Sequence, residues 1–202
     1  MNKLFFDIET LPAGKEKRKI LAEIHKKRIA DKKSEKTFEE YLESTGFDGA
    51  FGRIACIGYA LNEEPAKTFS KDEREMLKSF WKIAERTDLF IGFNAIDFDL
   101  RFIYQRSVIL GVKPSRDLSF ARYRNSPIYD VMWEWCKWDF QHKISLDVLA
   151  KALGLPSSKG GKVEGKSVAR AYKEGKIEEI CKYCEKDVEL TRKIYKRMIF
   201  EE

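Results

Sequence analysis

Long hydrophobic segments are absent from this chain of 202 residues. No apolar run reaches the ~20 residues that a membrane-spanning helix needs, and no signal peptide precedes the first apolar segment. A lipidation motif is also missing. These absences argue against an anchored or secreted protein, and we expect a soluble, cytoplasmic one.

Cysteine and histidine are scarce, with four and two residues respectively. Cys181 and Cys184 form one Cys-x-x-Cys, but a structural zinc site needs four ligands and no second pair lies nearby. Both cysteines fall in the apolar stripe of a predicted helix, which favours buried, reduced thiols over a zinc or redox centre. His25 lies among lysines and His142 follows an aromatic stretch, so we expect surface or structural roles for both.

Basic residues outnumber acidic ones, 39 to 33, which gives a formal net charge of +6 and an isoelectric point near 9.0. This balance favours a polyanionic partner such as nucleic acid. The length suits a single α/β domain, which we expect to span residues 1–202.

Two acidic residues follow the first apolar segment. Leu4, Phe5 and Phe6 form a run typical of a buried strand, and Asp7 and Glu9 come directly after it. Residues two apart on a strand point to the same face. Two like charges held this close are unfavourable unless protons or a cation compensate them. The pair therefore indicates a divalent-metal site.

Further acidic residues lie in two other motifs. Asp99 follows the apolar run 89–93, and strand ends are the usual place for sites in α/β sheets. Tyr183 and Asp187 are one turn apart on a predicted amphipathic helix, so their side chains project from one face. A single Asp is commonly a cap or a surface charge. The conjunction of four acids in three motifs favours a catalytic site instead.

The three motifs resemble those of the DEDD superfamily of 3′–5′ exonucleases. Asp7 to Glu9 matches the first motif, Asn94 to Asp99 the second, and Tyr183 to Asp187 the third. The Tyr is typical of the DEDDy branch, in which the chain is most similar to free-standing exonucleases related to the proofreading domain of family B DNA polymerases. The resemblance spans nearly the whole chain except an insert after Pro12. It implies an α/β, ribonuclease H-like fold, with helices on both faces of a mixed sheet.

The resemblance also implies an activity, namely hydrolysis of single-stranded DNA to nucleoside 5′-monophosphates with two divalent ions, Mg²⁺ or Mn²⁺. It assigns the metal ligands to Asp7, Glu9, Asp99 and Asp187, with Asp7 bridging both ions. Tyr183 would orient the attacking water, because its ordinary pKa of about 10 makes it a poor base at neutral pH.

Substrate contacts follow from the same resemblance. Thr10, Leu11 and Asn94 match positions that hold the terminal nucleotide, Leu11 as a base wedge. Two alternatives stay open at this stage. The chain could be a 3′–5′ exoribonuclease acting on short or structured RNA, because motifs do not reveal contacts to a 2′-OH. It could also be a noncatalytic nucleic-acid-binding module.

Apolar patterning predicts the remaining elements. After the first strand we expect strands at 53–61 and 66–69, a helix at about 71–86, and strands at 89–93 and 127–132. Ser145 can cap a helix that Gly154 ends and Pro156 blocks.

The insert at about 13–52 is strongly basic. Ile20, Leu21, Ile24 and Ile29 recur on an otherwise basic predicted helix. This helix could line the approach of a phosphate backbone, since it emerges beside the first acidic pair. It could equally be a solvated helix whose apolar stripe packs on the body.

Two other segments carry alternative interpretations. Trp133, Trp135, Trp138 and Phe140 could stack bases, although such clusters are more often core or a subunit contact. Residues 159–166 are glycine-rich and basic, and we expect a mobile connector that can touch phosphates. A P-loop is not expected there, because no strand precedes the segment.

Overall fold

The computed structural model describes residues 1–157 and 165–201, and its strands form one five-stranded sheet in the order β3-β2-β1-β4-β5. The strands are β1 (Lys3–Leu11), β2 (Arg53–Leu61), β3 (Lys67–Phe69), β4 (Leu89–Gly92) and β5 (Ile128–Asp130). The central strand β1 pairs antiparallel with β2 and parallel with β4. The outer pairs are β2 with β3, antiparallel, and β4 with β5, parallel. The expected mixed sheet is therefore confirmed.

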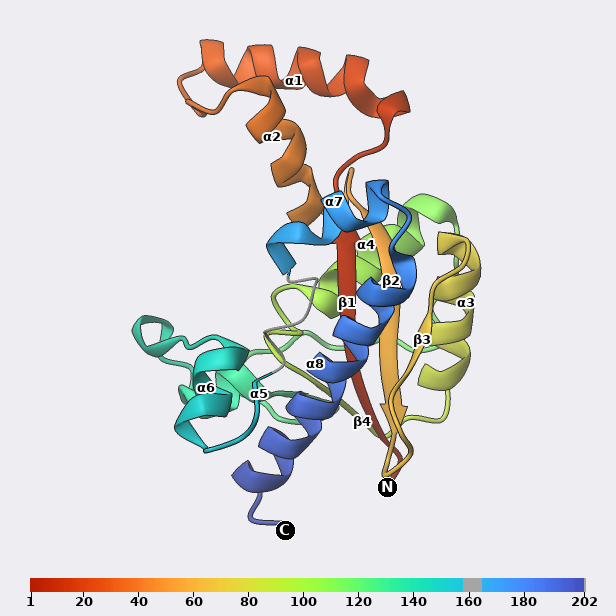
Figure 1. Ribbon diagram of the computed structural model, residues 1–202, viewed down its shortest axis with the longest axis vertical. Helices are drawn as coiled ribbons and strands as arrows, with labels where there is room; N and C mark the ends of the chain where they lie inside the picture. The colour runs from red at the N-terminus through yellow and green to blue at the C-terminus, as the bar shows by residue number, and fades with distance from the viewer. Residues whose placement is uncertain (158–164, 202) are drawn as a thin grey trace.

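Helices cover this sheet on both faces, with α8 crossing it over β1 and β2 (Figure 1). The α-helices are α1 (Arg18–Ala30), α2 (Phe38–Ser44), α3 (Glu73–Ala84), α4 (Asp99–Leu110), α5 (Val131–Trp135), α6 (Leu146–Ala152), α7 (Val168–Lys173) and α8 (Ile177–Met198). The 3-10 helices are η1 (Lys15–Lys17), η2 (Thr45–Phe47), η3 (Phe140–His142) and η4 (Gly165–Ser167). Within the described residues, no helix is both long and apolar enough to cross a membrane.

The alternation of side chains along β1 divides the core into two layers. Leu4, Phe6 and Ile8 are buried in the cluster that includes α3 and α4. Phe5 and Leu11 belong to clusters built with α8 and α7 on the opposite face. Because side chains alternate along a strand, the intervening odd-numbered residues of β1 also face α8.

Several local predictions can be compared with the structure. α6 begins as expected, because the Ser145 hydroxyl accepts from Val148 N, and Gly154 after its end has a positive φ of 68°. The predicted strand 127–132 is too long. The carboxylate of Asp130 caps α5, so β5 stops there and the following residues are helical. Most of the predicted connector 159–166 lies outside the described residues.

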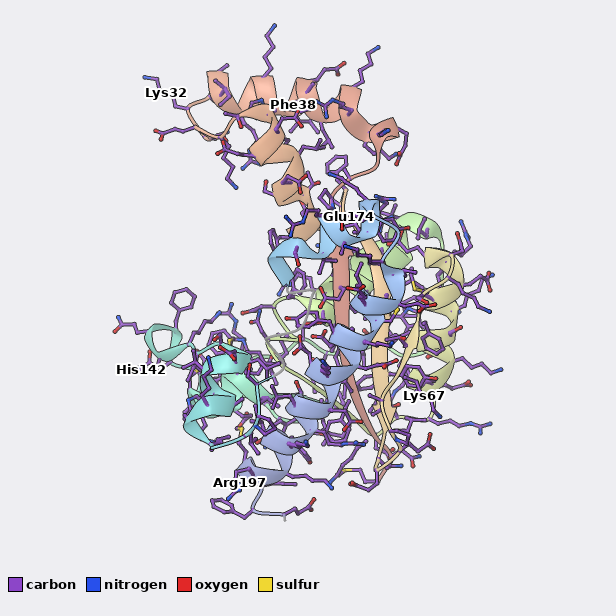
Figure 2. The ribbon with its side chains drawn as sticks, viewed as in Figure 1. Lys32, Phe38, Lys67, His142, Glu174 and Arg197 are labelled. Atoms are coloured by element: carbon purple, nitrogen blue, oxygen red, sulfur yellow. The ribbon has the colours of Figure 1, made fainter. Side chains whose placement is uncertain are left out.

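The insert forms a pair of helices that projects beyond the end of β1 (Figure 1). Leu21 is the buried residue of α1, and the ring of His25 stacks on Tyr41 of α2 at 5.3 Å. Figure 2 shows Lys32 at the outer end of this pair. α1 thus packs mainly on α2, while Ile20 and Ile29 of its apolar stripe remain 47% and 42% exposed. α2 itself was not predicted, although the capping box of Thr37 and Glu40 marks its start.

Candidate active site

The first acidic pair lies on the central strand and faces α8. Asp7 is opposite Gly58 of β2, and Glu9 is opposite Cys56. The register shifts between Glu9 and Thr10, so an irregularity of the β-bulge type directly follows the pair. Bulges of this kind redirect side chains where a site is needed. β1 therefore presents two carboxylates on one face, next to the point where its register with β2 shifts.

A glycine in β2 allows α8 to approach these carboxylates closely. A Cβ added at Gly58 would lie 2.7 Å from Cys184 Sγ and 3.0 Å from Val188 Cγ2, both on α8. A side chain at this position would therefore require Cys184 and Val188, or the helix that carries them, to shift. With glycine there, α8 brings Asp187 to the first pair, and carboxylate oxygens of Asp7, Glu9 and Asp187 all lie within 4.8 Å of one another.

The fourth acid reaches the group from the start of α4. Asp99 is 3% exposed, and its Oδ1 accepts a hydrogen bond from Ile8 N at 3.0 Å. Ile8 lies between the two acids of the first motif, so Asp99 is held beside them. Asp99 is not among the three residues whose oxygens gather within 4.8 Å. The structure thus brings the four acids together as a close trio and a neighbour.

Burial and mutual repulsion shape the electrostatics of the site. Burial, followed by the charges of Asp99 and Asp187, raises the pKa of Asp7 well above its ordinary value. Burial and then Asp187 raise the pKa of Glu9 in the same way. Burial raises the pKa of Asp99 to about 7, against the opposing effect of its bond from Ile8 N. If these acids were all ionised, the site would therefore hold more negative charge than the protein itself compensates.

The donor set fits a hard divalent cation. Each ligand atom is a carboxylate oxygen, the type that Mg²⁺ and Mn²⁺ prefer. A cation among the three gathered oxygens would oppose the two effects that raise the pKa values of Asp7 and Glu9, burial first and then mutual repulsion. The protein thus has the chemistry of a divalent-metal centre at this position.

Tyr183 lies one helical turn before Asp187, as the sequence predicts, and its hydroxyl interacts with the Asp187 carboxylate. Burial, and then the charges of Asp187 and Glu9, raise the pKa of Tyr183 above its ordinary value. The hydroxyl therefore stays protonated at neutral pH. In that form it is a hydrogen-bond donor, not a base.

The loop of the second motif is shaped by Asp130, an acid that was not predicted from the sequence to belong to the site. The fully buried carboxylate of Asp130 accepts from Asn94 N at 3.0 Å and from Ile96 N at 2.9 Å. Asn94 has a positive φ of 59°, and its Oδ1 is a buried acceptor with no partner among the described residues. The signal for Asp130 was its position between an apolar strand and a helix, which also makes it an N-cap.

Of the predicted substrate-binding residues, Thr10 lies near the acids, whereas the side chain of Leu11 is buried. The Thr10 hydroxyl is near the site and donates to Gly46 O at 2.7 Å. Leu11 is 3% exposed and packs with Val168 and Ala171 of α7, so its side chain is not presented as a base wedge. This correction follows from the alternation that places Leu11 under α7. Phe47, next to Gly46, is instead 78% exposed.

Phe47 also approaches the second motif, with its ring centroid 6.3 Å from that of Phe98. An exposed aromatic ring beside Thr10 and Phe98 was not expected. No local signal could have found it, because only the folded path of the insert returns Phe47 to the first motif.

The cysteines are buried thiols, as predicted. Cys56, Cys181 and Cys184 belong to one apolar cluster, and they are free. Cys184 Sγ lies 3.4 Å from Asp7 Oδ2, so the thiol donates to a carboxylate of the first pair. Among the described residues, the acidic trio is the group with metal-ligand spacing, and the cysteines do not form one.

The histidines lie away from the acids in the roles expected of them. His25 contacts the carbonyl of Lys36 at 2.8 Å within the insert. His142 is exposed and pairs with Asp139.

The sequence that ends in η4 contains the letters of a P-loop, with Gly160 followed by Gly165, Lys166 and Ser167 at the consensus spacing. The structural context is nevertheless missing, since the preceding described element is α6 rather than a strand. The letter match therefore carries no nucleotide-binding assignment.

A family profile matches residues 59–201, which is more than half of the chain. The family is described as a predicted 3′-5′ exonuclease related to the exonuclease domain of PolB. The chain belongs to this family. The matched range contains the segments 94–99 and 183–187, while the first acidic pair and the insert precede it.

Individual relatives agree with the family. A DNA polymerase of Pyrococcus glycovorans is 27% identical over 182 residues, which covers 75% of this chain and 23% of the polymerase. An uncharacterised protein of Methanocaldococcus jannaschii is 25% identical over 166 residues, which covers 78% of this chain and 92% of that protein. The chain thus spans about a quarter of the polymerase but nearly the full length of the second relative.

A structural comparison covers the first motif as well. The family B DNA polymerase of Pyrobaculum calidifontis matches 98% of this chain and 24% of the polymerase, with a TM-score of 0.69 and 15% identity. At this identity the match shows the fold. The ribonuclease H-like α/β fold and the relation to the PolB exonuclease domain, both predicted from the sequence, are therefore confirmed.

Proposed function

We propose that this chain is a single exonuclease domain that hydrolyses single-stranded DNA from its 3′ end, releasing nucleoside 5′-monophosphates. The observation that carries the proposal is the gathering of Asp7, Glu9 and Asp187 oxygens within 4.8 Å in a chain of a predicted 3′–5′ exonuclease family. Asp99 lies beside the trio through its bond from Ile8 N. A noncatalytic module has no need to assemble uncompensated acids at this cost.

The four acids have distinct places in this proposal. Asp7, Glu9 and Asp187 would hold one divalent cation, and Asp99 with Asp7 would contribute to a second position. When bound, Mg²⁺ or Mn²⁺ ions supply charge neutralisation and Lewis-acid activation of water. Water attacks the last phosphorus, the bond to the 3′ oxygen of the preceding nucleotide breaks, and that oxygen takes up a proton.

Other groups would position the reactants. The neutral hydroxyl of Tyr183 can donate a hydrogen bond that orients the attacking water or a phosphate oxygen. The free acceptor of Asn94 and the backbone at Thr10 would hold the terminal nucleotide. Leu11 could contact this nucleotide only through its backbone, because its side chain is buried. DNA is favoured over RNA because two of the three similar proteins reported above are DNA polymerases.

Digestion of end-labelled strands tests the proposal. Linear single-stranded DNA labelled at its 5′ end should shorten one nucleotide at a time with Mg²⁺ or Mn²⁺ and stay intact with EDTA. Circular single strands should survive. Glu9→Gln should abolish shortening, whereas Glu85→Gln, on the exposed end of α3, should cleave like the wild type.

Three results would count against it. Cutting of circles would indicate an endonuclease. Faster digestion of a matched RNA would replace DNA by RNA as the substrate. Tight binding of DNA without metal-dependent cleavage would point to the noncatalytic module.

A further inference from the structure

Three aromatic rings form a ladder close to the second acidic motif. The rings of Trp133 and Trp138 are stacked, with centroids 5.2 Å apart and planes at 10°. The ring of Tyr123 lies next along, with its centroid 5.3 Å from that of Trp138 and its plane tilted by 45°. Trp133 is 4% exposed and Tyr123 is 76% exposed, so the ladder leads from the core to the surface.

The inner end of the ladder is tied to the second motif. Trp133 Nε1 donates to Asp97 Oδ2 at 3.1 Å, and Lys143 Nζ pairs with the same carboxylate at 3.2 Å. The Lys143 ammonium also lies 4.1 Å from the Trp133 ring centroid and 4.8 Å from that of Phe140. Because Asp97 is two residues from Asp99, these rings begin beside the candidate active site.

The backbone that holds the rings is strained. Tyr123, Lys137 and Trp138 have φ values of 63°, 48° and 64°, a left-handed conformation that bulky residues avoid. Such conformations cost ~1–3 kcal/mol each and cluster at functional sites. The strain at Tyr123 is not explained by burial of its ring, which faces solvent.

The charge around the exposed rings is mainly basic. Arg122 and Arg124, both exposed, flank Tyr123. The Glu134 side chain is 12% exposed and paired with a lysine. Asp139 is exposed but hydrogen-bonded to His142. In Figure 2, His142 marks the segment that also carries Trp138, Phe140 and Lys143, on the side of the molecule away from α3.

We propose that this aromatic surface, made of Tyr123, Trp138, Phe140 and Lys143, binds the bases of single-stranded nucleic acid upstream of the cleaved end. Exposed rings with basic neighbours stack on unpaired bases of any sequence, whereas bases in a duplex are already stacked. The inference rests on the proposed function, because the bound strand is the one whose end reaches the metal site.

Ring-to-alanine variants test the surface. In a Glu9→Gln background, which prevents degradation, we would measure the Kd of a fluorescent oligothymidine of about 12 nucleotides. Tyr123→Ala and Phe140→Ala should each raise it by about 5- to 150-fold. Phe200→Ala is the matched control, since Phe200 is 94% exposed at the C-terminal end of the chain.

A small substrate separates this inference from the proposed function. The p-nitrophenyl ester of thymidine 5′-monophosphate has no upstream bases. In otherwise wild-type protein, the ring variants should hydrolyse it at the wild-type rate while the KM for the long strand rises. If the wild type hydrolyses neither substrate but its oligothymidine binding depends on the rings, only the proposed function fails.

Two outcomes would overturn the inference. One is that Tyr123→Ala and Phe140→Ala bind oligothymidine with the same affinity as the Phe200→Ala control. The other is a change in sedimentation with unchanged DNA affinity, which would assign the surface to contact between two copies of the chain.

Discussion

Two acids of this protein, the fully buried Asp130 and the half-buried Asp7, differ in what surrounds them. Asp130 accepts hydrogen bonds from four backbone N–H groups, those of Asn94, Ile96, Met132 and Trp133. Asp7 receives a weak thiol donor from Cys184 and faces three other carboxylates. A satisfied carboxylate of the first kind serves the fold, whereas an uncompensated one of the second kind is suited to a cation.

Tyr183→Phe tests the smallest change at the site. Loss of the hydroxyl should lower the single-turnover rate by roughly 10²–10⁴-fold, the range of a positioned hydrogen-bonding or proton-transfer group. The Kd for the strand and for Mn²⁺ should stay near wild type, because no ligand is removed. Tyr104→Phe, on the exposed side of α4, is the control. If the single-turnover rate of Tyr183→Phe matched that of the wild type, the Tyr183 side chain would contribute only to packing.

At the scale of elements, the distance between α8 and the sheet decides whether the site exists. Gly58 is the residue of β2 that permits this distance, since a Cβ there would meet both Cys184 and Val188. Asp187 is buried on the same helix, one turn beyond Tyr183. A shift of α8 would therefore move both residues away from the acids of β1.

Gly58→Ala should separate the third motif from the first. Overpacking at this contact should destabilise the fold by roughly 1–3 kcal/mol and lower the single-turnover rate even where the variant is fully folded. Adding Cys184→Ala removes the Sγ atom 2.7 Å from the new Cβ and should restore part of the rate. We would compare thermal melts and rates of the single and double variants. A folded Gly58→Ala variant with the wild-type rate would show that α8 tolerates the shift.

At the scale of the whole molecule, the metal-free acidic site should make stability depend on pH. The pKa of Asp99 is raised to about 7, and those of Asp7 and Glu9 are also raised. At a pH above the ordinary pKa values of these acids, the unfolded chain has released their protons while the folded protein still retains them. This contribution to stability is therefore complete below about pH 4 and is lost as pH rises toward 7.

The measurement is a series of thermal melts at pH 5 and pH 7.5, with EDTA or with Mn²⁺. Because this contribution is lost as pH rises, the Tm of the metal-free protein should be lower at pH 7.5 than at pH 5. Mn²⁺ should raise the Tm more at pH 7.5 than at pH 5, because the ligands are then ionised. Glu9→Gln should reduce both effects, and Glu85→Gln should reproduce the wild type. If Mn²⁺ raised the Tm of Glu9→Gln as much as that of the wild type, Glu9 would not be a metal ligand.

Most local features of this protein could be predicted from its sequence. The alternation around Asp7 and Glu9, the one-turn spacing of Tyr183 and Asp187, and the capped helix after Ser145 are all properties of a single segment. Periodicity and capping residues report backbone geometry within a few residues, so they can be recognised without the fold. The three motifs and their order were also sufficient to indicate the family.

Only the tertiary structure decided how these segments meet. It placed Asp99 against Ile8 N, assigned Asp130 to the second motif, buried Leu11 and left Phe47 exposed. It also divided the aromatic segment into a buried Trp133 and exposed rings. Each of these outcomes depends on contacts between residues far apart in the chain, such as the approach of α8 that Gly58 allows. A local pattern carries no information about such distances, because they result from the packing of the whole core.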